Sequence, residues 1–107
     1  MSFRALLQEL QSEPGYAGQL LHVRSLPARA PRYAEVRCPL SPATTALLER
    51  VGLTRLYTHQ AAAIDAARAG EHVTVVSGTA SGKTLTYLIP IMEALAVAPR
   101  SRALLLF

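Results

Sequence analysis

Residues 77–84 constrain the fold of this chain more than any other feature, because the segments on both sides of them fit one local structure. The run reads Ser-Gly-Thr-Ala-Ser-Gly-Lys-Thr. Residues 72–76 before it are mostly apolar and β-branched, which is typical of a buried parallel strand. After it, apolar residues recur at helical spacing, at Leu85, Leu88, Ile89, Met92 and Leu95. The sequence therefore predicts a strand, a phosphate-binding loop and a helix in direct succession.

The residue types of this loop suit a bound nucleoside triphosphate. In a tight turn at a helix start, successive backbone N–H groups point inward, and the positive end of the helix adds to their attraction for phosphate. The Lys83 ammonium would reach the β- and γ-phosphates as the catalytic group, and the Thr84 hydroxyl would coordinate Mg²⁺. The candidate nucleotide-binding residues of the loop are Ser77, Gly78, Thr79, Ala80, Ser81, Gly82, Lys83 and Thr84.

One position departs from the complete phosphate-loop pattern, which begins with glycine where this chain has Ser77. A serine can stand there if its φ stays negative, and Gly78 beside it can supply a positive φ. The alternative interpretation is an ordinary loop with a solvated lysine. The agreement of the strand, the loop and the helix favours phosphate binding.

The composition fits one small domain in a reducing compartment. The chain has 107 residues, half of them hydrophobic, and its only cysteine is Cys38. One cysteine excludes an intrachain disulfide and a cysteine-cluster metal site, so we expect a cytoplasmic protein. No stretch approaches the roughly 18 consecutive apolar residues of a membrane span, so no membrane partner is expected. The net charge of +4 suits a polyanion such as nucleic acid, and equally an ordinary solvated basic surface.

The first 40 residues predict a short helix followed by an extended arm. Apolar residues at positions 3, 6, 7 and 10 indicate an amphipathic helix that residues 12–15 end. Residues 20–40 contain three prolines, which favours an extended segment along a surface, with a candidate strand at residues 20–23.

Two helices are predicted between the arm and the loop. Ser41 as N-cap and Pro42 as first helical residue begin one, which Gly52 ends. Thr58 is the candidate N-cap of the other, which stops at Gly70.

The last segment predicts a second parallel strand. The helix after Lys83 contains Pro90, but its apolar period continues beyond, so we expect a kink rather than a stop. Residues 103–107 then resemble a buried strand, which would complete a βαβ unit from residue 72 to residue 107. Two strands do not make a complete sheet, so the chain is expected to be an incomplete piece of a larger α/β domain.

Three segments together resemble the start of a superfamily 2 DEAD/DEAH-box helicase core. They are residues 56–64, which read Leu-Tyr-Thr-His-Gln-Ala-Ala-Ala-Ile, residues 77–84, and residues 104–107. The resemblance is sharpest to DNA repair helicases of the mitomycin repair factor A type, a RecQ-like group. In that family a serine or alanine commonly replaces the first glycine of the loop, as Ser77 does here.

This resemblance implies an ATP-binding part of an ATP-dependent DNA helicase, with ATP and Mg²⁺ as cofactors and DNA as a partner. Residues 53–107 would be the truncated start of a RecA-like P-loop domain with a parallel sheet, and residues 1–52 a helical and extended leader. The loop would be motif I of the family, the Walker A motif. Two other classes stay open from the residues alone: another P-loop protein such as a small-molecule kinase, and a nonenzymatic basic interaction module.

The resemblance also gives Gln60 a role as the glutamine that reads adenine. Its amide can donate to adenine N7 and accept from N6, which would select ATP over GTP. The alternative is that Gln60 satisfies the backbone at the start of its own helix. Two roles likewise stay open for Tyr57, which could stack on the base or pack on the helix. The three histidines do not have the spacing of metal ligands.

Two parts that helicase hydrolysis uses are not in the sequence: an acidic motif after a later strand, and an arginine finger from a second domain. The only acid after Lys83 is Glu93, in the middle of the predicted helix. The chain is therefore expected to carry only part of a nucleotide site.

Overall fold

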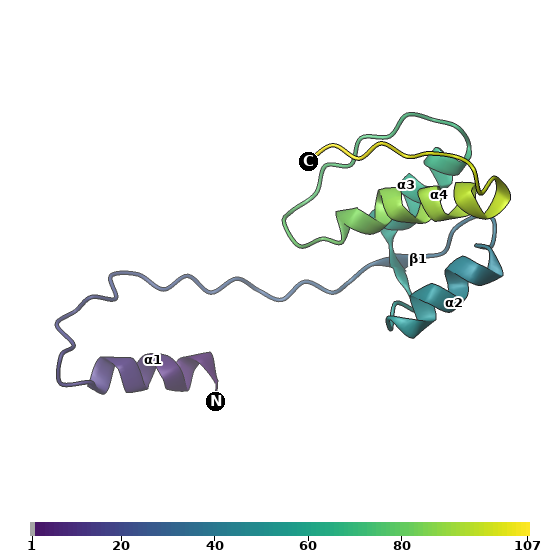
Figure 1. Ribbon diagram of the computed structural model, residues 1–107. Helices are drawn as coiled ribbons and strands as arrows, with labels where there is room; N and C mark the ends of the chain where they lie inside the picture. The colour runs from purple at the N-terminus through teal and green to yellow at the C-terminus, as the bar shows by residue number, and fades with distance from the viewer. Residues whose placement is uncertain (1) are drawn as a thin grey trace.

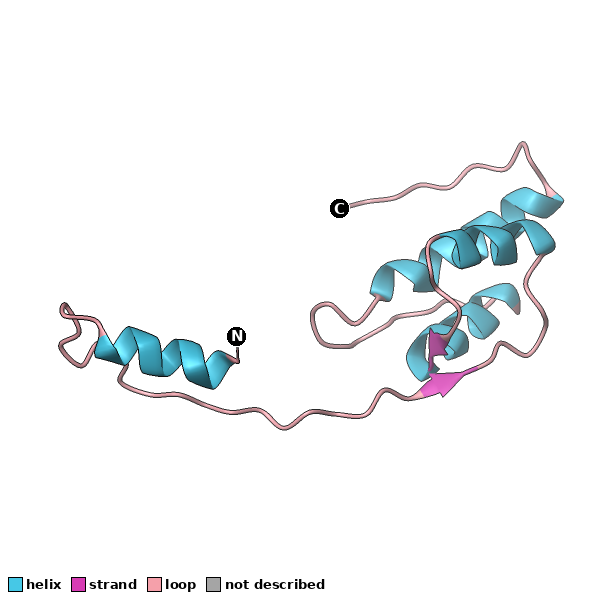
Figure 2. Ribbon diagram, turned by 90° about the horizontal axis from the view of Figure 1, so that it is seen from below, coloured by secondary structure: helices cyan, strands magenta, loops and turns pink. Residues whose placement is uncertain are grey.

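The computed structural model describes residues 2–107, which form four helices and one two-stranded ribbon (Figure 1). In chain order the elements are α1 (Phe3–Ser12), β1 (Tyr33–Ala34), α2 (Pro42–Arg50), β2 (Leu56–Tyr57), α3 (Thr58–Arg68) and α4 (Lys83–Val97). The helix α1 lies at the far end of the extended arm, away from the other three (Figures 1 and 2). The predicted helix at residues 3–12 and the extended conformation of the arm are thus confirmed. Two expectations are wrong: residues 20–23 form no strand, and residues 21–31 are exposed along their whole length instead of lying along a surface, because they pack against no other element of residues 2–107 (Figure 1).

The core forms where α2, α3 and α4 meet. Leu48 of α2, Ile64 of α3 and Ile89 of α4 are its buried members. Four partly buried side chains surround them: Val36, Leu40, Leu56 and Leu85. The apolar stripe of α4 therefore faces this core through Leu85 and Ile89, as its helical spacing predicts.

The ribbon ties the arm to the start of α3. β1 and β2 are antiparallel, with Tyr33 opposite Tyr57 and Ala34 opposite Leu56. The Thr58 N–H donates to the carbonyl of Arg32 at 2.9 Å, which extends the pairing into the first residue of α3. The arm thereby places Tyr33 beside the helix that leads to the phosphate loop.

The helix ends of α2 follow the predicted signals. Ser41 is the N-cap, and its Oγ accepts the Thr44 N–H at 3.3 Å. Pro42 is the first helical residue, and Gly52 follows the helix with φ 77°, the left-handed conformation that favours glycine.

The start of α3 corrects one prediction. α3 begins at Thr58, and its N-cap is Tyr57 rather than Thr58. The reason is that the Gln60 Oε1 accepts the Tyr57 N–H at 2.8 Å, so a side chain inside the first turn satisfies this backbone group. Gly70, with φ 83°, ends the helix as predicted.

The predicted parallel strands are not formed in the described residues. Residues 72–76 and 103–107 are extended, but neither segment has strand hydrogen bonding, so the βαβ unit and the parallel sheet are absent there. Both segments lie beside α4 and border a cavity of about 520 Å³ that Val73, Val75, Leu104 and Leu105 help to line (Figure 1). Val76 is 92% exposed and Leu106 is 85% exposed. A strand needs hydrogen-bonded neighbours, and apolar side chains this exposed have no sheet to pack in.

The helix α4 continues through Pro90 to Val97, which confirms that the proline does not stop it. The kink stays a prediction. Among residues 2–107, no helix is both long enough and apolar enough to cross a membrane.

Candidate nucleotide site

The phosphate loop connects the extended residues 72–76 to α4, as the sequence predicts. Gly82 is the N-cap of α4 and has φ 77°, and Lys83 is the first helical residue. Ala80 at the exposed tip of the loop also has a positive φ, of 58°. A non-glycine residue in this conformation costs about 1–2 kcal/mol, so the loop is held in a strained shape by its surroundings.

Lys83 is folded back over its own loop. Its Nζ donates to the carbonyl oxygens of Ser77 at 2.8 Å and Gly78 at 2.9 Å. The hydroxyls of Ser77 and Ser81 are hydrogen-bonded to each other across the loop. The ammonium therefore lies against the backbone of the loop, and phosphate contacts would replace these carbonyl contacts when a nucleotide binds.

The remaining loop residues are accessible. The side chains of Thr79 and Thr84 are exposed, and Thr84 lies in the first turn of α4. An exposed hydroxyl beside the lysine is suited to coordinate Mg²⁺. Within residues 2–107, no group of three or more His, Cys, Asp or Glu residues is arranged to hold a metal by itself.

Gln60 connects α3 to this loop. Its side chain is buried, with 2% of the residue exposed. The Oε1 accepts the Tyr57 N–H at 2.8 Å, and the Nε2 donates to the Gly82 carbonyl at 2.9 Å. Gln60 thus satisfies the backbone at the start of its own helix with one bond, as one of the two interpretations predicts, and it reaches the loop with the other. The adenine contact stays a prediction, and it requires these amide atoms to make further or different bonds.

His59 is a site residue that sequence reasoning missed. Its Nε2 lies 2.8 Å from the carbonyl oxygen of Ser81, 22 positions later in the chain. Spacing in the sequence carried no signal for this contact, because it exists only once α3 and α4 are packed together. The histidine is partly buried and is bonded to a residue far from it in the sequence.

A row of stacked side chains leads away from His59. The His59 ring is stacked on Tyr57, with ring centroids 5.8 Å apart and planes at 9°. Tyr57 is stacked on Tyr33, at 5.4 Å and 10°, so it packs on neighbouring rings in this structure. The Arg55 guanidinium carbon lies 3.8 Å from the centroid of the Tyr33 ring, a cation–π contact.

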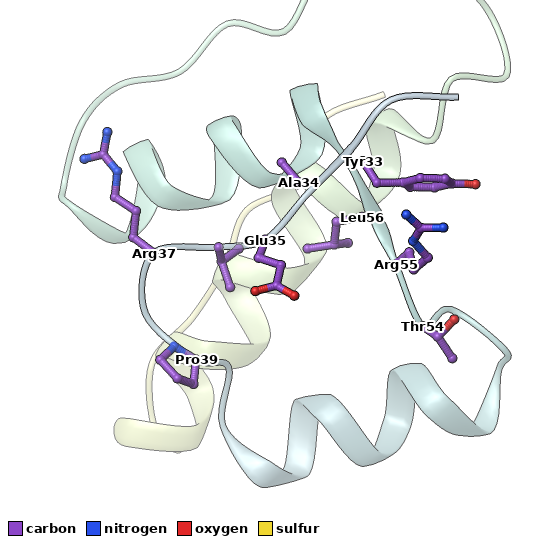
Figure 3. Close-up of a pocket in the computed structure, with 9 residues that line it drawn as sticks. Tyr33, Ala34, Glu35, Arg37, Pro39, Thr54, Arg55 and Leu56 are labelled. Carbon is purple, nitrogen blue, oxygen red and sulfur yellow. The ribbon is translucent and has the colours of Figure 1, made fainter. Parts of the chain in front are cut away.

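The far end of this row borders a cavity of about 560 Å³ (Figure 3). The ribbon and the segment after β1 line it, with Glu35, Arg37 and Arg55 as its charged residues. None of residues 77–84 is among its lining residues, so this cavity is separate from the phosphate loop.

Glu93 has a structural role far from the loop. Its carboxylate accepts the Ser41 N–H at 3.0 and 3.2 Å, and Arg68 lies 3.6 Å away. Burial alone would raise its pKa, but hydrogen bonds from Thr44 and Ser41 and the charge of Arg68 outweigh this, so the pKa is lowered. Glu93 comes ten positions after Lys83 in α4, which is a rise of roughly 15 Å along the helix. Glu93 therefore joins α2, α3 and α4 and lies far from the phosphate loop.

Comparison with known proteins shows that the loop and α3 are similar to one family. The sequence profile of the DEAD/DEAH box helicases matches residues 57–107. This part of the chain is therefore similar to the DEAD/DEAH box helicases. The match begins at Tyr57, so it includes the Gln60 and His59 contacts as well as the complete loop.

Two curated proteins are similar to nearly the whole chain, including the residues before Tyr57. The ATP-dependent helicase hrq1 of Schizosaccharomyces pombe is 37% identical over 99% of this chain and 10% of its own length. The ATP-dependent helicase HRQ1 of Saccharomyces cerevisiae is 30% identical over 95% of this chain and 9% of its own length. The chain thus spans about a tenth of these curated relatives.

One solved helicase structure is similar to nearly the whole chain. It is the crystal structure of the DUF1998 helicase MrfA bound to DNA and AMPPNP, with a TM-score of 0.73 and 26% identity. The alignment covers 95% of this chain and 14% of that chain. The predicted resemblance to superfamily 2 repair helicases is confirmed by this similarity and by the two relatives.

Proposed function

We propose that this chain is the ATP-binding part of an ATP-dependent DNA helicase that acts in DNA repair. The observation that carries the proposal is the position of Lys83 at the start of α4, with its ammonium 2.8 and 2.9 Å from two carbonyls of the loop. A lysine at this place, beside the unpaired N–H groups of a helix start, is suited to bind the β- and γ-phosphates. The names of the two yeast relatives, both ATP-dependent helicases, support the same assignment.

Each loop residue has a role in this proposal. The backbone of residues 77–82 surrounds the phosphates, and Lys83 neutralises the charge that grows on the transferred phosphoryl group. Thr84 would hold Mg²⁺ through its hydroxyl, and the ion would offset the negative charge of the phosphates. Gln60 reads adenine, which selects ATP.

DNA is the proposed partner of the whole enzyme. The net charge of +4 is consistent with a polyanionic partner, and a structurally similar helicase was crystallised with DNA. Residues 1–52 are proposed to be a leader to a RecA-like domain that starts at residue 53. A cytoplasmic location is proposed from the single cysteine.

A titration with a fluorescent ATP analogue tests this function. The chain should bind the analogue in the presence of Mg²⁺, and unlabelled ATP should displace it at lower concentration than GTP does. Equal displacement by ATP and GTP would support another P-loop class such as a kinase instead. No saturable binding would contradict the nucleotide site as a whole.

A further inference from the structure

The first turn of α3 holds two successive carbonyl groups of the phosphate loop. The His59 Nε2 lies 2.8 Å from the Ser81 oxygen, and the Gln60 Nε2 donates to the Gly82 oxygen at 2.9 Å. A carbonyl oxygen can only accept, so the His59 Nε2 carries the hydrogen. Two neighbouring side chains on one helix therefore fix two peptide groups of the loop.

Fixing a carbonyl also fixes the next N–H group. The described chain contains no cis peptide bonds, and in a trans peptide the C=O and the N–H that follows it point in opposite directions. The contact of His59 with Ser81 therefore directs the N–H of Gly82 away from α3. In the same way, the contact of Gln60 directs the N–H of Lys83.

These two N–H groups are at the start of α4, and the start of a helix attracts anions. The first N–H groups of a helix have no partner inside the helix, and phosphates bind to them. When such groups are already oriented, less conformational freedom is lost on binding. Contacts within the protein thus orient the C-terminal half of the loop before any phosphate binds.

The orientation of the Ser81 peptide depends more on His59 than the orientation of the Gly82 peptide depends on Gln60. The Gly82 oxygen has a second partner, since it also accepts the Leu85 N–H at 3.2 Å. Within residues 2–107, His59 is the sole hydrogen-bond partner of the Ser81 oxygen. Removing this contact leaves the Ser81 peptide free to rotate.

The orientation of the histidine ring is itself supported. Its plane is within 9° of the Tyr57 ring, and Tyr57 is stacked in turn on Tyr33 of the arm. Stacked aromatic rings attract each other beyond the effect of their buried area. The Nε2 lies in the ring plane, so the stack holds it toward Ser81.

We propose that His59 is a positioning residue for triphosphate binding: its Nε2–H, held in place by the stack on Tyr57 and Tyr33, orients the Gly82 N–H toward the phosphate. This inference rests on the proposed nucleotide site and adds a residue to it. His59 touches the loop, not the ligand, and it acts through the Ser81 peptide.

Two substitutions separate the donor from the ring. His59→Phe keeps an aromatic ring for the stack but has no donor, whereas His59→Gln places an amide N–H near the same position without the ring. The probes are a fluorescent ATP analogue and inorganic triphosphate with Mg²⁺, which displaces the analogue. Inorganic triphosphate has no base, so its affinity reports the loop without any contact to adenine.

His59→Phe should weaken the affinity for inorganic triphosphate about 3- to 10-fold, the value of one neutral hydrogen bond. His59→Gln should restore it to within about 2-fold of the unsubstituted chain, because the donor is regained. The analogue should follow the same order, and far-UV circular dichroism should be the same for all three proteins.

Two results would overturn the proposal. One is wild-type triphosphate affinity in His59→Phe while Lys83→Ala still loses binding, which leaves the nucleotide site standing without a role for His59. The other is an equal loss in His59→Phe and His59→Gln, which means that a donor at position 59 does not restore binding. A loss of affinity in His59→Gln with an unchanged far-UV spectrum decides the case even if His59→Phe is poorly folded. If the unsubstituted chain binds neither probe, the proposed function fails together with this inference.

Discussion

Gly82→Ala tests the contact between α3 and the phosphate loop in isolation. Gly82 has φ 77°, and a Cβ at this position would lie 2.5 Å from the Gln60 Nε2. The positive φ costs an alanine about 1–2 kcal/mol. The collision displaces the amide of Gln60, which is 2% exposed, and leaving a buried polar group unsatisfied costs about 1–3 kcal/mol more. The free energy of unfolding should therefore fall by about 2–5 kcal/mol.

Two other glycines provide matched controls. Gly52 has the same φ of 77°, and a Cβ added there would meet nothing within 4 Å, so Gly52→Ala measures the backbone strain alone. Gly78 has neither a positive φ nor a neighbour within 4 Å of an added Cβ, so Gly78→Ala should be close to neutral. The assay is urea unfolding followed by circular dichroism, with the slope compared between variants.

The difference between Gly82→Ala and Gly52→Ala measures the collision with Gln60. In a Gln60→Ala background this difference should vanish, because the clashing amide is gone. Equal costs of Gly82→Ala and Gly52→Ala in the unsubstituted chain would refute the reasoning, since Gln60 would then not hold the loop.

Three further outcomes are expected. Gln60→Ala should remove about 1–3 kcal/mol of discrimination for ATP over GTP, measured as the ratio of the two affinities; an unchanged ratio would leave Gln60 as a helix-start and loop contact only. The pKa of Glu93 is lowered from its ordinary 4.5, so its contribution to stability is present above pH 4.5 and is lost as the pH falls through the lowered value. In Glu93→Gln, the free energy of unfolding should therefore fall less steeply at acid pH. An identical pH profile of the two proteins would contradict the assigned contacts. The chain should release no phosphate from ATP in response to single-stranded DNA, because Glu93 is about 15 Å from the loop lysine; turnover above that of a Lys83→Ala control would show that an acid reaches the γ-phosphate.

Local chemistry explains which parts of the fold could be predicted. The ends of α2 and α3 follow from Ser41, Pro42, Gly52 and Gly70, whose preferences act over a few residues. The helix after Lys83 follows from its apolar period. The sequence signals place the N-cap of α3 one residue too late, because a longer side chain, Gln60, satisfies the backbone there.

The parts of the fold and of the site that could not be predicted depend on interactions between segments that are distant in the sequence. Residues 72–76 have the composition of a buried strand, but a strand exists only when other strands pair with it, and none does so within residues 2–107. The loop could be predicted because its residues are contiguous. The contacts of His59 with Ser81, and of Tyr33 with Tyr57, could not be, because they join segments that are separate in the sequence.

The most direct test of the account is the affinity of Lys83→Ala for a fluorescent ATP analogue with Mg²⁺. Loss of a charge-assisted phosphate contact should cost about 3 kcal/mol, roughly a 100-fold rise in the dissociation constant. Arg100→Ala removes an exposed positive charge outside the loop and should leave the constant unchanged. Far-UV circular dichroism should be nearly the same for all three proteins. An unchanged dissociation constant in Lys83→Ala would contradict the account, because residues 77–84 would then not be a phosphate-binding loop.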